Sequence, residues 1–245
     1  MLNRFVAALG DHPRALTIAA ILLMAAIGWL WLIATVLPGR LSEGLMAVMV
    51  DSGNAGSLVL TFAMWVAMVF AMMLPTAAPT FRAYADRAGA ATFMLVAGYT
   101  AVWLVVAVLA TAGQGVLVRA GALAPHMEPA GVALSASILI AAGIYQFTPL
   151  KWLCLVRCRN PRVADLEAGA AAFRIGIEEG LACLGCCWAM MAVMFAAGLM
   201  NLGVMALLGA LIGLEKLIDG TKVTYFLGVL LILAGVILAS GLVIG

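Results

Sequence analysis

The sequence predicts an all-α fold, a polytopic transmembrane helix bundle with about seven spans. Of its 245 residues, 66% are hydrophobic and only 10% are charged, and the mean hydropathy is +1.18. A soluble domain carries about 25% charged residues, so this chain cannot cover its surface with charge. Apolar runs of the length that a bilayer requires, roughly 17–25 residues, follow one another along it. We therefore expect an integral membrane protein.

Seven apolar stretches are predicted spans, at about 15–37, 57–75, 91–118, 132–149, 179–200, 202–218 and 225–244. The first is too long for the apolar region of a signal peptide and lacks a small-residue cleavage site, so we expect it to remain as an anchor. Only "EKLIDGTK" separates the sixth stretch from the seventh. The longest polar segment, 151–178, is a predicted cytoplasmic loop, and "RVADLEAGAAAFRIGIEEG" within and just beyond it favours an amphipathic surface helix. No separate soluble domain fits, so residues 1–245 form one predicted transmembrane domain.

Basic residues are divided unequally between the two sides that these spans define. Eleven Lys and Arg fall on the side of the N-terminus and two fall on the other side. The larger group is Arg4, Arg14, Arg82, Arg87, Lys151, Arg157, Arg159, Arg162, Arg174, Lys216 and Lys222, and the smaller is Arg40 and Arg119. Because cytoplasmic loops carry the excess of basic residues, we expect a cytoplasmic N-terminus and an external C-terminus. The expected location is the inner (cytoplasmic) membrane of a bacterium.

Charge and motif content exclude several classes of protein. The net charge of +2 and the lack of a basic run give no support for nucleic-acid binding. No P-loop, dinucleotide fingerprint or zincin motif is present, so an ATP-driven pump is unsupported. Proton-coupled transporters place acidic or histidine relays at membrane depth, and the predicted spans hold almost no ionisable residues. The charges gather instead at the cytoplasmic ends of the spans, at Lys151, Glu178, Glu179, Glu215 and Lys216.

These charged residues at the span ends have two interpretations. The first is a solvated, ion-paired rim. The second makes Glu179 or Glu215 an outer partner that orients metal ligands.

Five cysteines reach the predicted cytoplasmic side, where thiols are kept reduced, so a structural disulfide is disfavoured. In a helix, Cys183, Cys186 and Cys187 fall within roughly a 100° arc, and Met190 and Met194 continue that face. The cluster would lie in the first turns of the fifth span, where free N–H groups and the helix dipole favour thiolates. A second pair, Cys154 and Cys158, shares a helical face if its segment is helical.

A methionine stripe lies in the second predicted span. Met64, Met68 and Met72 recur every four residues, and Pro75 is expected to break or kink the helix after them. Thioethers and thiolates are the soft ligands that select Cu(I) over hard cations. Two helices therefore offer sulfur ligands from the cytoplasmic face into the bilayer.

Other uses of these sulfurs stay open at this point. Cysteine and methionine pack well in apolar interiors, and cysteines near a membrane surface can be palmitoylated. The "CLGC" of Cys183 and Cys186 also suits a membrane thiol–disulfide redox protein. A membrane metalloenzyme is a further alternative, although two histidines cannot supply an imidazole-built oxygenase site.

Three motifs carry a resemblance to a known family. They are "MWVAMVFAMMLPTAAP", "AAGIYQFTPLKWLCLVRCRNP" and "GIEEGLACLGCCWAMMAVMFAAGLMNL", together with "LEK" at 214–216. Over roughly residues 60–218 the chain resembles an uncharacterised bacterial family, a domain of unknown function described as predicted metal-binding integral membrane proteins. The resemblance implies metal binding and identifies neither the metal nor a reaction. The positions that match its motifs are Met64, Met68, Met72, Met73, Pro75, Tyr145, Gln146, Thr148, Pro149, Lys151, Cys154, Cys158, Cys183, Cys186, Cys187, Trp188, Asn201, Glu215 and Lys216.

We therefore expect a soft-metal-binding membrane protein for metal handling, transfer or transport, not an enzyme. The expected metal is Cu(I), with zinc or another thiophilic ion as alternatives. The predicted ligands are Cys183, Cys186, Cys187, Cys154, Cys158, Met190, Met194, Met64, Met68 and Met72, and the predicted surrounding residues are Trp188, Glu179, Glu215, Lys151 and Gln146. The expected partners are the lipid bilayer, the metal ion and a metal-donor or membrane partner protein.

Overall fold

The computed structural model describes residues 13–36, 43–45, 48, 55–121, 131–161, 170–199 and 201–241. Every regular element in these ranges is helical, which confirms the all-α fold. The elements are α2 (Pro13–Val36), α4 (Ala55–Met68), the π-helical η1 (Val69–Met73), α5 (Leu74–Ala88), the short η2 (Gly89–Ala91), α6 (Thr92–Arg119), α7 (Val132–Tyr145), α8 (Pro149–Arg159), α9 (Ala170–Ala197), α10 (Leu202–Leu217) and α11 (Lys222–Ala239).

Five helices in the described ranges are long and apolar enough to cross a membrane: Ala15–Val36, Gly56–Ala85, Thr92–Arg119, Ala171–Ala197 and Lys222–Ala239. Helices α7 and α8 pass the same test only together, with a 65° bend between them, and make a sixth candidate. The protein is therefore a multi-pass membrane protein with five or six candidate spans. A seventh span is not confirmed, because the 16 residues of α10 rise about 24 Å, less than the roughly 30 Å of a bilayer core.

The second span does not end at Pro75 as expected but continues through η1 and α5. A helical proline removes the hydrogen bond to the carbonyl four residues earlier, which here belongs to Ala71. The indole of Trp29 in α2 donates to that carbonyl at 3.1 Å. The five-residue π-turn directly before Leu74 absorbs the change in geometry. The helical chain therefore continues across the proline.

The segment 151–178 is not a loop throughout, as the sequence had indicated. Helix α8 begins at Pro149 after Thr148, whose hydroxyl accepts a hydrogen bond from the Lys151 N–H at 3.3 Å, and proline suits this first helical position. Helix α9 begins at Ala170, well before the predicted 179. Residues 162–169 of the predicted surface helix, and the predicted span limits at 37, 200 and 242–244, lie outside the described residues.

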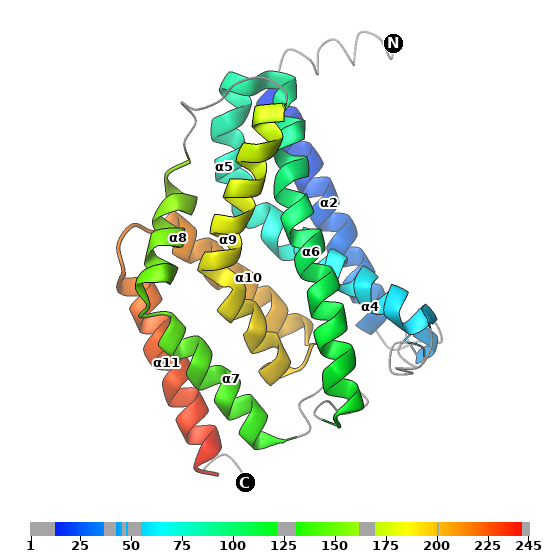
Figure 1. Ribbon diagram of the computed structural model, residues 1–245, viewed down its shortest axis with the longest axis vertical. Coiled ribbons are helices and arrows are strands. Elements are labelled where there is room, and N and C mark those ends of the chain that lie inside the picture. Colours follow the sequence, from blue (N-terminus) through cyan, green and yellow to red (C-terminus); the bar gives the residue numbers. More distant parts are fainter. Residues whose placement is uncertain are drawn as a thin grey trace.

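Glycines bring α6 and α9 into close contact near their N-terminal ends, at the upper end of the bundle (Figure 1). A Cβ on Gly98 would overlap the backbone of Phe173, and one on Gly176 would overlap the backbone of Leu95. Small residues of this kind let membrane helices approach closely. This contact fixes the register of the two helices that flank the cysteines.

A second glycine contact pairs α7 with α11, which lie side by side on one flank in Figure 1. A Cβ on Gly143 would lie 2.8 Å from the carbonyl oxygen of Gly228, and one on Gly235 would lie 2.9 Å from that of Ala136. Helices α2, α4 and α6 lie on the opposite flank, and α9 and α10 lie between the two groups.

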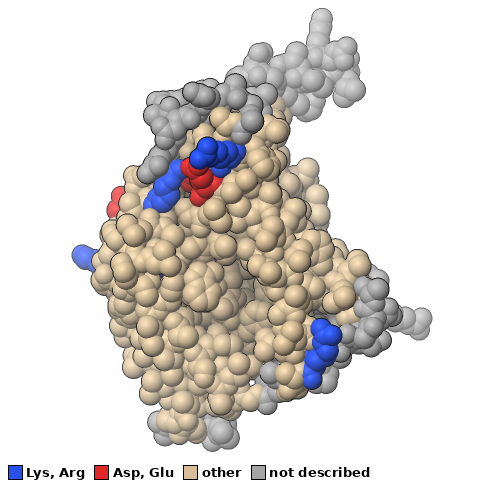
Figure 2. Space-filling model, viewed as in Figure 1, with Lys and Arg blue, Asp and Glu red and all other residues tan. Residues whose placement is uncertain are grey.

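The surface carries a broad band without charge. In Figure 2, acidic and basic side chains gather near the upper end, a basic side chain lies at the lower right, and the face between them is uncharged. Exposed large apolar residues include Leu23, Leu30, Val105, Leu109 and Phe226. Such a surface suits lipid rather than water.

Candidate metal centre

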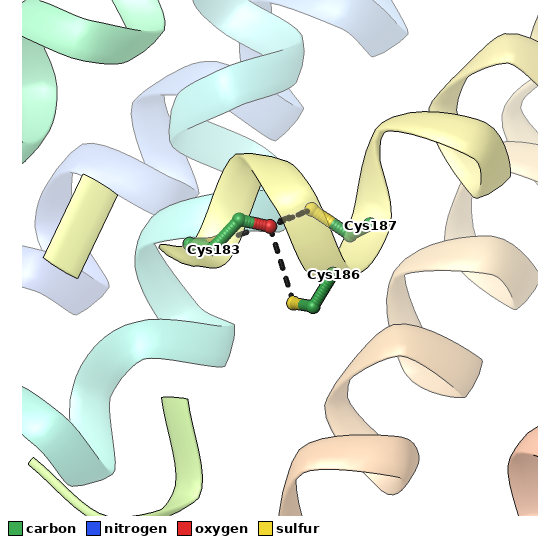
Figure 3. Close-up of side chains that lie close together, drawn as sticks. All are labelled: Cys183, Cys186 and Cys187. Carbon is green, nitrogen blue, oxygen red and sulfur yellow. Dashed lines mark hydrogen bonds between the residues drawn. The ribbon is translucent and has the colours of Figure 1, made fainter. Parts of the chain in front are cut away.

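Three cysteines of α9 form a buried cluster. The thiols of Cys183, Cys186 and Cys187 lie within 4.8 Å of one another, and each side chain is at most 2% exposed. Figure 3 shows that the Cys186 and Cys187 thiols both turn back to the carbonyl oxygen of Cys183, to which they donate at 3.1 and 2.8 Å. One turn of helix therefore gathers three sulfurs.

Two further sulfurs from other elements complete what we call the sulfur centre: Met73, Cys158, Cys183, Cys186 and Cys187. The Cys158 Sγ of α8 lies 3.7 Å from the Cys186 Sγ, and the Met73 Sδ of η1 lies 3.7 Å from the Cys187 Sγ. The Cys183 and Cys187 sulfurs are 4.0 Å apart. All five cysteines of the chain are free thiols.

The spacing of these sulfurs suits a shared soft metal ion. Metal–thiolate bonds of roughly 2.3 Å keep the sulfurs of a tetrahedral or trigonal site roughly 3.8–4.0 Å apart. The separations of 3.7–4.0 Å match that range. Thiols and a thioether also form the donor set that soft metals prefer. The residues present therefore fit a thiophilic ion by donor type and by these separations.

Cys183 has the most polar surroundings of the sulfur centre. The Tyr99 hydroxyl of α6 lies 3.0 Å from its Sγ, and the Lys216 Nζ of α10 donates to the same sulfur at 3.1 Å. Lys216 also donates to the Thr76 hydroxyl at 2.9 Å. A cation beside a thiol favours the thiolate. Three helices thus converge on one sulfur.

The prediction that the helix dipole favours thiolates at the cysteine cluster is wrong. Helix α9 begins at Ala170, so Cys183 lies more than three turns inside it. The dipole acts only within the first turn, and the peptide N–H groups there are already bonded within the helix. The positive charge of Lys216, beside the Cys183 sulfur, favours the thiolate instead of the dipole.

Buried ion pairs fix α8 against its neighbours. Lys151 contacts Glu215 at 2.8 Å, and Arg157 contacts Glu179 at 2.9 Å. Glu179 also accepts a hydrogen bond from the Tyr84 hydroxyl at 2.9 Å. Each pair joins α8 to another element, α10 in the first case and α9 in the second. These contacts hold Cys158 against Cys186.

The interpretation of the charged residues as a solvated rim is wrong for three of them. Lys151, Glu179 and Glu215 are at most 2% exposed, because each has its partner inside the bundle. Glu178 is exposed and pairs with Arg174 at the surface, as expected of a rim. In the described contacts, neither Glu179 nor Glu215 touches a sulfur; both contact the cations of α8 instead.

The predicted methionine ligands lie in the same core as the cysteines, at most 2% exposed: Met64, Met68, Met72, Met190 and Met194. Among the described contacts, the methionine that meets a thiol is Met73, through Cys187. An α-helical period places every fourth residue on the stripe, whereas a π-turn places residue i beside i+5. The turn at Val69–Met73 therefore brings Met73 below Met68.

The contacts described for three other predicted residues lie outside the sulfur centre. Trp188 is 46% exposed and packs edge-on against Tyr145, with ring centroids 4.9 Å apart. Gln146 is buried at the bend between α7 and α8, and neither of its amide atoms has a hydrogen-bond partner. Cys154 is half-buried and lies against Gly185 of α9.

Sequence reasoning omitted several contacts from the predicted ligand and surrounding sets, namely Met73, Thr76, Tyr84, Tyr99, Arg157 and Lys216. Lys216 had a usable signal, because an ionisable residue inside a predicted span marks a functional site by default. Tyr99 had no such signal in the sequence, since a single tyrosine in an apolar helix is typical of a packing residue. Its position depends on the glycine contact between α6 and α9.

A family model for PpoB2, described as a copper chaperone, matches residues 62–238, which is most of the chain. No curated protein and no solved structure matches the chain. The resembled family is therefore a named, copper-related one, and the match extends beyond the three motifs through α10 into α11. The chain belongs to the PpoB2 copper chaperone family.

Proposed function

We propose that this protein is an intramembrane Cu(I) chaperone, which holds copper at the sulfur centre and passes it to a recipient protein. One observation carries the proposal: four thiols and a thioether from three elements lie 3.7–4.0 Å from their neighbours inside the bundle of a PpoB2 family member. Copper is the cargo, and no chemical reaction is proposed.

Charge balance is satisfied by Cu(I) held by two thiolates. Cu(I) with two thiolates carries one net negative charge, and an uncompensated charge in an apolar interior is costly. The ammonium of Lys216, 3.1 Å from Cys183 Sγ, supplies one positive charge. A thioether such as Met73 adds a soft donor without adding charge. Zinc remains the main competing cargo, because thiolates bind it as well.

The buried methionines extend the proposal deeper into the membrane. Met190 and Met194 follow Cys186 and Cys187 along α9, and Met64, Met68 and Met72 line α4 and η1 beside them. We propose that they are further soft ligands along the route of the ion. Their burial in one core with the cysteines supports this role.

The membrane arrangement is part of the proposal. The eleven-to-two division of basic residues favours a cytoplasmic N-terminus and an external C-terminus. With α10 counted as a short crossing, the whole chain is one seven-span transmembrane domain in a bacterial inner membrane. The sulfur centre then faces the reducing side, where Cu(I) and thiols persist.

Copper content of the purified protein tests the function. Protein purified in detergent under reducing conditions is expected to bind near-stoichiometric Cu(I), and Cys183→Ser with Cys187→Ser to abolish it. Met73→Leu is expected to weaken binding, whereas Met94→Leu serves as the matched control because Met94 is 47% exposed on α6. Elemental analysis after supply of copper or zinc distinguishes the cargo. Metal-free protein after both treatments would contradict the proposal.

A thiol–disulfide redox protein is the second candidate. Cys158 and Cys186 lie 3.7 Å apart, closer than Cys183 and Cys187 at 4.0 Å, whereas the "CLGC" spacing suggests a Cys183–Cys186 pair. Such a cycle needs an oxidised partner to take up two electrons from the pair. Alkylation trapping in cells decides the matter: a Cys158–Cys186 disulfide that changes with growth conditions favours redox chemistry, and thiols that stay reduced exclude it.

A further inference from the structure

A cavity lies at the bend between α7 and α8, beside the start of α11 (Figure 1). Its volume is about 260 Å³, and residues of all three segments line it. Residues 146–148, which belong to neither α7 nor α8, are part of its wall. A break in a membrane helix is tolerated where the backbone is buried in protein or lines a cavity, and in transporters such breaks form binding sites. The bend therefore directs attention to what this cavity holds.

Two buried polar side chains in the cavity wall lack partners. Gln146 of the bend is 1% exposed and Thr224 of α11 is 2% exposed. Among the described residues, neither amide atom of Gln146 and not the hydroxyl of Thr224 has a hydrogen-bond partner. Thr148, which also lines the cavity, differs because its hydroxyl donates to the Tyr145 carbonyl at 2.8 Å. Buried polar groups without partners are costly, and here two of them, far apart in the sequence, border one cavity.

The side chains around the cavity define the chemistry of its ligand. Among the described residues that line it, none is Asp, Glu, Lys or Arg, so an ionic group inside would lack a counter-charge. Phe147, Trp152 and Tyr225 supply aromatic walls, and the rings of Phe147 and Tyr225 stack with centroids 5.3 Å apart. The Gln146 amide both donates and accepts hydrogen bonds, as a hydroxyl does. An uncharged group that bears hydroxyls therefore suits the cavity.

The surface at the cavity mouth favours a lipid as the source of that group. Trp152 and Tyr225 are partly exposed, and their neighbours Leu153 and Phe226 are large apolar residues on the surface. Such a surface suits acyl chains, and Trp and Tyr are enriched at the level of lipid head groups. Lys222, which is exposed, begins α11 two residues before Thr224. The cavity thus lies where apolar surface gives way to charge.

We propose that this cavity is a lipid site, in which the hydroxyl-bearing head group of a membrane lipid bonds Gln146 and Thr224 while its acyl chains lie on the apolar surface outside. The site is separate from the sulfur centre and does not depend on the proposed function. Hydroxyls of the head group donate to the Gln146 carbonyl oxygen and accept from its amide nitrogen, and the Thr224 hydroxyl completes the set.

Thermal unfolding of the delipidated full chain with added lipid tests the site. The protein is held in an amine-oxide detergent, whose head group carries no hydroxyl. Phosphatidylglycerol, whose head group ends in a free diol, is expected to raise the Tm by roughly 5 °C or more at saturation. Phosphatidylcholine and phosphatidic acid with the same acyl chains are expected to raise it far less. Native mass spectrometry should show phosphatidylglycerol retained on the protein after the detergent is removed.

Variants assign the effect to the cavity. Gln146→Leu and Thr224→Val are each expected to lose most of the Tm rise and of the retained phosphatidylglycerol. Ser137→Ala is the matched control, because Ser137 is exposed on α7 outside the cavity, and it should respond as the native protein does. An equal rise with phosphatidic acid would overturn the proposal, because head-group charge would then be what is recognised. A full native response in Gln146→Leu and Thr224→Val would overturn it too, and so would the same Tm with all three lipids.

Discussion

Two glycine-mediated helix contacts, α6 with α9 and α7 with α11, share a geometry and differ in what flanks them. Between α6 and α9, the close approach at Gly98 brings the next residue, Tyr99, within 3.0 Å of the Cys183 sulfur. Between α7 and α11, the approach at Gly228 faces Gln146, whose amide is buried without a partner. Close packing alone therefore makes no metal site; the sulfurs and the lysine beside the first contact do.

The largest expected effect comes from filling the first contact. Gly176→Ala places a methyl group in the Leu95 backbone, and overpacking of this kind costs about 1–3 kcal/mol or more. We expect a large loss of thermal stability in detergent and of copper binding. Gly235→Ala, the matched change in the second contact, is expected to lower stability while the folded protein keeps its copper. Copper loss in Gly235→Ala, with copper kept in Gly176→Ala, would contradict the comparison.

Removing the cation beside Cys183 is expected to have the next largest effect. Lys216→Met leaves the negative copper–thiolate group uncompensated, so Cu(I) affinity should fall roughly tenfold or more, equivalent to about 1.4 kcal/mol. Lys222→Met, on an exposed residue at the start of α11, is the control and should bind normally. Competition against a Cu(I) chelator measures both. Equal Cu(I) affinities in Lys216→Met and Lys222→Met would show that Lys216 stabilises the fold and has no part in copper binding.

A smaller effect is expected from the tyrosine that the first contact positions. Tyr99→Phe removes a hydroxyl that contacts the Cys183 sulfur and donates to the Met73 carbonyl at 3.3 Å. A single hydrogen bond contributes about 0.5–1.5 kcal/mol, so copper affinity should fall severalfold. Tyr225→Phe, on the α11 side, should leave it unchanged. Chelator competition detects the difference, and a native affinity in Tyr99→Phe would remove the hydroxyl from the site.

The smallest expected effect on copper comes from the second contact. Gln146→Leu replaces a buried amide without a partner by an apolar side chain, which should raise stability by about 1–3 kcal/mol and leave copper content unchanged. Thermal unfolding and elemental analysis measure the two quantities. A drop in copper content would instead assign Gln146 to the metal site, as the sequence had led us to expect.

The comparison also shows what the sequence could predict. Spacing along one helix grouped Cys183 with Cys186 and Cys187, because the α-helical period is known in advance. It could not assign Lys216 to Cys183, since that contact depends on how far α10 rises beside α9. Nor could it place Met73, because a local π-turn shifts the methionine stripe by one residue. The inward pairing of Lys151 and Glu215 likewise needs the tertiary packing of α8 on α10.

Helix lengths were harder to predict than helix identities. Hydropathy ends a span where polar residues begin, but α9 continues upstream through Arg174, Glu178 and Glu179, whose charges are paired. Pro75 read as a stop, yet Trp29 replaced the hydrogen bond that the proline removes. Local composition does not reveal partners that arrive from another helix.

The π-turn before Pro75 is equivalent to a one-residue insertion in an otherwise regular helix. An unbroken α-helix of the same length, without the π-turn, would rotate everything beyond it by about 100°. Thr76 and Tyr84 would then leave their partners Lys216 and Glu179. The π-turn thus sets the rotation of the second half of this span, and with it the positions of the Met73 thioether and of the residues that support the thiols.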